Sequence, residues 1–101
     1  MKLLITDIDG SLLPFGQSEL SPALIEFFGG LNPEHVCVTF ATGKPFSRAL
    51  PLAQALGITT PLICANGALI KDPITHDVLL CEPIEERIAS DIIHLLASDP
   101  R

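Results

Sequence analysis

The sequence predicts an α/β fold in which a parallel sheet alternates with helices as β-α-β-α-β, half of a doubly wound, Rossmann-like core. Short apolar runs alternate with longer amphipathic stretches, and the connections between them are short. The runs are apolar at consecutive positions, which is typical of parallel strands covered on both faces. These observations together predict a parallel sheet with crossover helices.

The three predicted strands are apolar runs that end in polar residues or at a turn. They cover residues 2–7, 36–41 and 62–65. Each is short enough for a strand and too short for a typical helix. We therefore expect three buried strands, each followed by a polar turn.

Two predicted helices connect these strands. Ser21 and Pro22 have the residue types of an N-cap and a first helical position, and Gly29 marks the end of that helix. The second helix covers residues 45–56, and Gly57 ends it. Pro51 lies inside this stretch and is expected to kink the helix or to delay its start.

The pattern changes after the third strand. Two apolar runs at residues 68–70 and 78–80 enclose a polar turn at 71–77, which predicts a β-hairpin. A last helix is predicted over residues 84–97. Its apolar stripe consists of Ile88, Ile92, Leu95 and Leu96.

Composition excludes several classes of protein. The 101 residues are enough for one small domain or part of a larger one, and 48% apolar against 18% charged residues excludes disorder. The net charge of −6 argues against a basic surface that binds nucleic acid. No apolar run is long enough for a membrane span or a signal peptide, so we expect a cytoplasmic protein without membrane partners.

The three cysteines do not form a recognisable metal or disulfide pattern. Cys37, Cys64 and Cys81 are widely spaced, and no histidine lies at a zinc-ligand spacing from them. Each has apolar neighbours in the sequence. We therefore expect three buried free thiols.

Polar residues follow all three predicted strands. Asp7 and Asp9 follow the first, Thr42 and Lys44 the second, and Asn66 the third. Ligands of open parallel sheets bind at the carboxyl ends of the strands. We therefore expect these side chains to converge on one site.

The Asp7-Ile8-Asp9-Gly10 stretch is the sharpest of these features. Two close carboxylates repel each other unless a cation joins them, and Mg²⁺ is the natural partner of such oxygen ligands. One carboxylate could act as a nucleophile and the other as an acid and base. The alternative is an Asp-rich turn after a strand, since Asp and Gly both favour turns.

Thr42-Gly43-Lys44 offers a hydroxyl, a flexible backbone N–H and a cation, which are phosphate-binding groups. The alternative is a simple strand-to-helix turn with a solvated lysine. Asn66 could contact a substrate, but Asn66-Gly67 is also a common turn sequence.

These motifs together resemble the haloacid dehalogenase superfamily. Residues 7–12 are similar to its first signature, residues 40–44 to its second, and residues 63–68 to the Asn-Gly-Ala stretch of the Cof-type branch. The resemblance implies Mg²⁺-dependent hydrolysis of a small phosphorylated metabolite, often a sugar phosphate. It also implies that Asp7 is the nucleophile and a metal ligand. Asp9 would be the acid and base and would lend its carbonyl to the metal, while Thr42, Gly43 and Lys44 would hold the phosphoryl group and Asn66 the substrate.

The sequence departs from the family pattern in three places. Ser11 stands where Thr is commoner. Lys44 stands where Arg is usual, so the two parallel hydrogen bonds that a guanidinium can give to one anionic group are absent. The family's later Lys and acidic pair have no counterpart in this sequence. We therefore expect residues 1–83 to be the N-terminal part of the core with its hairpin, and residues 84–101 to be the start of a cap that is otherwise missing.

If the chain is the N-terminal part of such a hydrolase, its isolated form should have exposed apolar surface. The first strand would normally be central in the sheet, so here it would have a bare edge and an uncovered apolar face. The chain alone is expected to be inactive. Two other hypotheses remain: a non-catalytic module that binds phosphate or Mg²⁺, and a structural half-domain that pairs with another chain. The sequence leaves the oligomeric state open.

Overall fold

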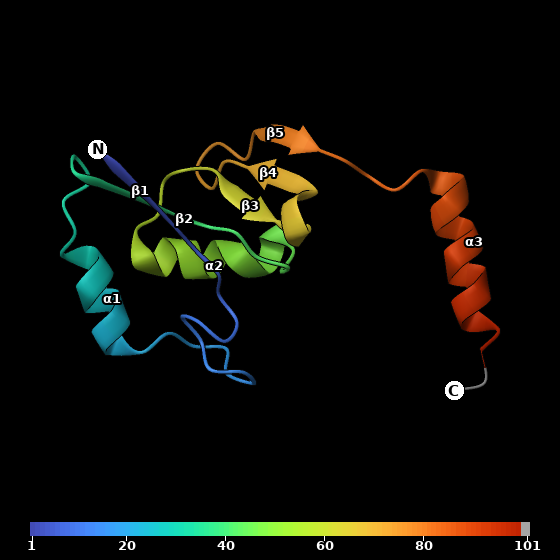
Figure 1. The fold of residues 1–101 in the computed structure, drawn as a ribbon, viewed down its shortest axis with the longest axis horizontal. Helices are drawn as coiled ribbons and strands as arrows, with labels where there is room; N and C mark the ends of the chain where they lie inside the picture. The colour runs from blue at the N-terminus through green and yellow to red at the C-terminus, as the bar shows by residue number, and fades with distance from the viewer. Residues whose placement is uncertain (100–101) are drawn as a thin grey trace.

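The computed structural model describes residues 1–99, and it has the predicted alternation of strands and helices (Figure 1). The first five elements are β1 (Lys2–Thr6), α1 (Pro22–Gly29), β2 (Val36–Phe40), α2 (Phe46–Leu56) and β3 (Leu62–Cys64). The predicted β-α-β-α-β order is therefore confirmed.

The three strands lie in the order β1-β2-β3. Strand β1 pairs with β2 in parallel along its whole length. Strand β3 joins β2 through a parallel bridge between Ala41 and Ile63, and the Thr60 hydroxyl donates to the Val38 carbonyl at 2.6 Å. The carboxyl ends of the three strands consequently face the same edge, as the predicted site requires.

The predicted hairpin is also present. A short 3₁₀ turn, η1 (Ala65–Gly67), leads from β3 into β4 (Leu69–Lys71), and β4 pairs in antiparallel fashion with both β3 and β5 (Val78–Cys81). In the hairpin turn, the Asp72 carboxylate accepts hydrogen bonds from the N–H groups of Thr75 and Ile74, which lower the pKa of that carboxyl.

The helix ends follow the sequence signals closely. At the start of α1 the Ser21 hydroxyl accepts a hydrogen bond from the Leu24 N–H at 3.2 Å. Helix α2 begins at Phe46, runs through Pro51 and ends before Gly57, whose φ of +71° is the left-handed conformation that glycine favours. Pro51 therefore does not delay the start of this helix, which begins five residues before it.

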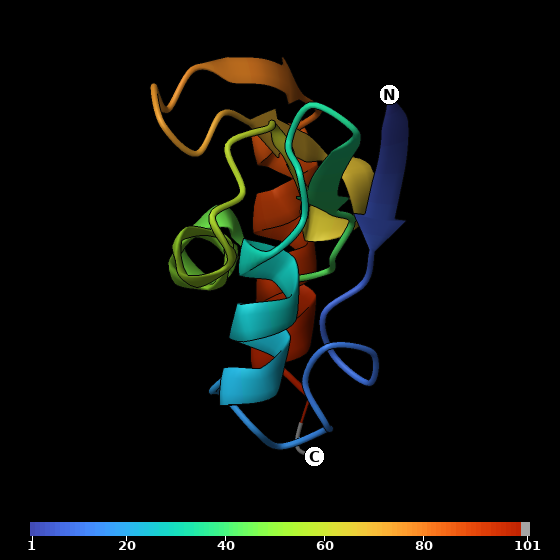
Figure 2. The ribbon, with the colours of Figure 1, turned by 90° about the vertical axis from the view of Figure 1, so that its left-hand side faces the viewer.

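The core lies between α2 and the strands. Right-handed crossovers place α1 and α2 on the same side of the sheet (Figures 1 and 2). The most deeply buried side chains come from β2, β3, α2 and the loop after β1. They are Ile8, Leu13, Phe40, Ala49, Ala53, Leu62 and Cys64.

The expectation that β1 is a buried strand is wrong for this chain. Leu3, Leu4 and Ile5 are 61%, 43% and 49% exposed. In residues 1–99 the outer edge of β1 has no partner strand, and both core helices cover the same side of the sheet. The bare edge and uncovered apolar surface implied by the family resemblance are therefore present.

The expectation of three buried thiols is also wrong in part. Cys64 is buried, Cys37 is half-buried, and Cys81 is exposed. Cys81 belongs to β5, whose side chains are all exposed, because this strand is the outer one of the hairpin. Apolar neighbours in a sequence do not ensure burial when the strand lacks a covering layer.

The last helix, α3 (Glu86–Ala97), lies apart from the rest of the chain at the end of an extended segment (Figure 1). It begins at Glu86 rather than at the expected Ile84, and it has no buried residue. The radius of gyration is 16.3 Å, against about 13 Å for a compact chain of this length. Among the described residues, no helix has the length and hydrophobicity needed to cross a membrane.

Candidate active site

Asp7 stands directly after β1, at the carboxyl end of the strand. Its side chain is exposed, and its Oδ1 accepts a hydrogen bond from the Ile8 N–H at 2.7 Å. This bond fixes the orientation of the carboxylate without burying it. The second carboxylate oxygen therefore remains accessible to a ligand.

The loop after Asp7 is held by a buried side chain and a glycine. Ile8 is fully buried between the two aspartates, and its carbonyl accepts the N–H groups of the next turn. Gly10 has a φ of +80°, and a Cβ there would lie only 2.6 Å from the ring of Phe15. The turn that presents Asp9 therefore requires glycine at position 10.

The ends of β2 and β3 are joined by backbone hydrogen bonds. The Ala65 N–H donates to the Lys44 carbonyl at 2.9 Å, and the Asn66 N–H donates to the Thr42 carbonyl at 3.0 Å. Asn66 has a left-handed backbone with a φ of 55°. The predicted phosphate loop, residues 42–44, and the predicted substrate-binding Asn66 are thus in direct contact.

Thr42 is buried at the base of this loop. Its hydroxyl oxygen accepts a hydrogen bond from the Lys44 N–H at 3.1 Å. The hydroxyl proton can still be donated to another acceptor. This geometry suits a group that holds an anionic oxygen.

Asp9 and Lys44 form an ion pair that links the two loops. Lys44 Nζ lies 3.3 Å from Asp9 Oδ2, and the side chains are 20% and 41% exposed. The sequence predicts that the Asp9 side chain is the acid and base, that its carbonyl binds the metal, and that Lys44 holds the phosphoryl group. The structure pairs the two side chains with each other, and within residues 1–99 it shows no ion pair to the carboxylate of Asp7.

A cleft of about 590 Å³ opens beside this pair. The loop after β1 and the first turns of α2 form its walls, and its lining includes Arg48, Ser47 and Gln17, which sequence reasoning missed.

Two oxygen donors of this site suit a magnesium ion. The Asp7 carboxylate is exposed, and within the described residues the Asp9 carbonyl oxygen accepts no hydrogen bond. Mg²⁺ binds hard oxygen ligands and usually takes one or two carboxylates, with water and phosphate completing the shell. No group of three or more His, Cys, Asp and Glu side chains able to hold a metal occurs among residues 1–99.

The comparison with protein families decides the classification. The model of the haloacid dehalogenase-like hydrolases matches residues 4–100. The chain belongs to the haloacid dehalogenase-like hydrolases. The matched range includes every residue proposed above for the site.

Individual members of this family are similar over nearly the whole chain. Phosphatase YwpJ of Bacillus subtilis is 31% identical over 98% of this chain, and the pyridoxal phosphate phosphatase YbhA of Escherichia coli is 30% identical over 94%. A solved haloacid dehalogenase-like hydrolase from B. subtilis is 32% identical, with a TM-score of 0.75 over 97% of this chain.

The chain spans about a third of the length of these relatives. The matches cover 34% of YwpJ, 35% of YbhA and 34% of the solved B. subtilis chain. This coverage fits the expectation that the chain corresponds to the N-terminal portion of such a hydrolase.

Proposed function

We propose that this chain supplies the nucleophile and the phosphate loop of a Mg²⁺-dependent phosphatase that hydrolyses a small phosphorylated metabolite. The observation that carries the proposal is the arrangement of Asp7, Thr42 and the Asp9–Lys44 pair at the carboxyl ends of adjacent parallel strands. The similar phosphatases named above support the same reaction class.

In this proposal Asp7 attacks the phosphorus of the substrate. An Asp7 carboxylate oxygen forms a new P–O bond, the bond between phosphorus and the leaving-group oxygen breaks, and an aspartyl-phosphate results. The hydrogen bond from the Ile8 N–H to Asp7 Oδ1 orients the carboxylate, so the other oxygen is the attacking atom.

Asp9 moves the proton in both steps. Once the bound phosphoryl group has drawn Lys44 away, Asp9 takes up a proton from solvent and gives it to the leaving-group oxygen. It then takes a proton from the water that attacks the phosphorus of the aspartyl-phosphate, which releases inorganic phosphate and restores Asp7. Lys44 holds Asp9 before substrate arrives. A bound phosphoryl group competes for the ammonium group of Lys44 and so releases Asp9 for proton transfer.

The phosphoryl oxygens are held by the loop at the end of β2. The Thr42 hydroxyl and the ammonium group of Lys44 are the donors, and the backbone of Gly43 lets the phosphate approach closely. Mg²⁺, held by the Asp7 carboxylate and the Asp9 carbonyl, would neutralise charge on the phosphoryl group.

To test the proposal, residues 1–101 are joined to the remaining two thirds of phosphatase YwpJ of B. subtilis. Hydrolysis of para-nitrophenyl phosphate by the joined protein is then measured with Mg²⁺. Asp7→Asn is expected to abolish turnover and to leave the circular dichroism spectrum unchanged. Asp77→Asn, the same change in the hairpin turn, is the matched control and should keep full activity. Near wild-type turnover by Asp7→Asn would contradict the assignment. Phosphate binding without turnover in the unmutated protein would favour the non-catalytic binding module.

A further inference from the structure

The cleft beside the Asp9–Lys44 pair lies on the leaving-group side of the proposed reaction. Asp9, the proposed proton donor, lines the cleft, whereas Asp7 does not. The oxygen that Asp9 protonates belongs to the leaving group. The rest of the leaving group therefore extends from Asp9 into the cleft.

Of the two cationic side chains that line this cleft, one has an ion-pair partner and the other does not. Lys44 is neutralised by Asp9, but Arg48 has no ion-pair partner among residues 1–99. Asp9 is the sole carboxylate of the described lining, and Ser47, Gln17 and Ser18 add uncharged hydrogen-bonding groups. Arg48 is exposed at the wall of the cleft, so its guanidinium is accessible to an anionic group of a ligand bound there.

We propose that Arg48 binds a second anionic group on the substrate, so that the preferred substrates are phosphomonoesters that also carry a phosphate or a carboxylate. The proposal rests on the proposed function, because it takes the cleft as the leaving-group site. The planar guanidinium binds either group through two parallel hydrogen bonds.

The size and lining of the cleft limit the substrate further. About 590 Å³ lies within the range of roughly 300–1,000 Å³ typical of small-molecule sites. Leu13, Pro51 and Leu52 add apolar side chains to the cleft lining. A short carbon body with an anionic group at each end satisfies both features.

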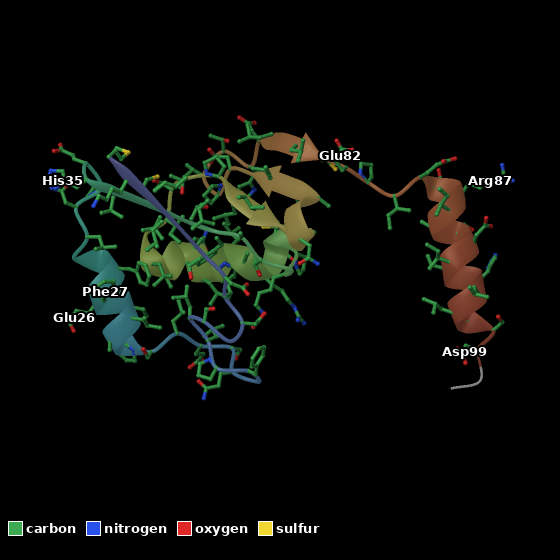
Figure 3. The ribbon with its side chains drawn as sticks, in the orientation of Figure 1. Glu26, Phe27, His35, Glu82, Arg87 and Asp99 are labelled. Carbon is green, nitrogen blue, oxygen red and sulfur yellow. The ribbon has the colours of Figure 1, made fainter. Side chains whose placement is uncertain are left out.

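The test is a titration followed by NMR, with MgCl₂ present throughout, of the 101-residue chain carrying Leu4→Lys, a change on the exposed strand β1 that is meant to keep the chain monomeric. The three ligands are glycerol 3-phosphate, 3-phosphoglycerate and fructose 1,6-bisphosphate. The first has one phosphate, the second adds a carboxylate, and the third adds a second phosphate. The variants are Arg48→Gln, Arg48→Lys and, as the matched control, Arg87→Gln on the distant helix α3 (Figure 3).

We expect at least one of the two doubly anionic ligands to bind about tenfold more tightly than glycerol 3-phosphate, a difference of about 1.4 kcal/mol. Arg48→Gln should remove this preference and leave glycerol 3-phosphate binding unchanged. Arg48→Lys should keep part of the preference, and Arg87→Gln should keep all of it. Which of the two ligands gains affinity identifies the second group as carboxylate or phosphate.

Three results would overturn the proposal. The first is equal binding of all three ligands when Arg48 is present; this result would still agree with a phosphate site and so with the proposed function. The second is an undiminished preference in Arg48→Gln. The third is an equal loss in Arg87→Gln, which would indicate general charge attraction. Failure of all three ligands to bind would overturn the proposed function together with this inference.

Discussion

The side-chain amide of Asn66 lies against the backbone of Gly43, so closely that a Cβ added to Gly43 would stand 3.0 Å from Asn66 Oδ1. This contact joins the phosphate loop after β2 to the turn after β3. A side chain at position 43 would require the Asn66 amide to shift. Glycine at position 43 is therefore favoured by a neighbouring side chain, whereas glycine at position 10 is also favoured by its own left-handed backbone.

Gly43→Ala tests this contact. We expect the substitution to lower the free energy of unfolding by about 1–3 kcal/mol, the usual cost of overpacking, and to weaken phosphate binding. Urea unfolding and a phosphate titration measure the two effects. Gly29→Ala is the control, because a Cβ there meets nothing within 4 Å. Equal behaviour of the two variants would show that Asn66 yields without cost.

The proposed Mg²⁺ site is incomplete in this chain, so metal binding should be weak. The Asp7 carboxylate and the Asp9 carbonyl provide part of an octahedral shell, and water must fill the rest. We expect a dissociation constant in the millimolar range, about 4 kcal/mol of binding free energy. Calorimetry measures it, and Asp7→Asn should weaken it further. Micromolar affinity would mean that another ligand completes the site.

The three thiols should react at very different rates. Burial raises the pKa of the Cys64 thiol, so at a given pH it has less reactive thiolate than an exposed cysteine. With a thiol reagent at pH 8, Cys81 should react first, Cys37 more slowly, and Cys64 last. Mass spectrometry of the labelled peptides gives the order. Fast labelling of Cys64 without denaturant would contradict the burial described for β3.

The sequence was sufficient for those elements whose signals are local. The Ser21 cap of α1, the Gly57 end of α2 and the hairpin around Asp72 all depend on residues close in the chain, and all were predicted. The strand order predicted that the loops of Asp9 and Lys44 lie close together, but it could not predict their ion pair, because that contact depends on the side-chain conformations at the ends of the two loops. The exposure of β1 likewise depends on which layers cover it.

That exposure predicts how the isolated chain behaves. Leu3, Leu4 and Ile5 on the open strand β1, with the apolar stripe of α3, present surfaces that favour self-association. We expect sedimentation to show oligomers or aggregates and thermal melting to be weakly cooperative. Leu4→Lys on the open edge should shift the chain toward the monomer. A cooperative monomeric melt above about 60 °C, near the upper end for ordinary domains, would show that the half-sheet is stable alone.

The most direct test of the account is to find which residue carries the phosphoryl group during turnover. The protein in which residues 1–101 are joined to the rest of YwpJ is mixed with substrate and Mg²⁺ and quenched with acid. It is then digested, and its peptides are analysed by mass spectrometry. The account predicts a phosphoryl group on Asp7 of the wild type and on no residue of Asp7→Asn. Turnover with the phosphoryl group on another residue, or turnover with no phosphorylated residue at any quench time, would contradict it.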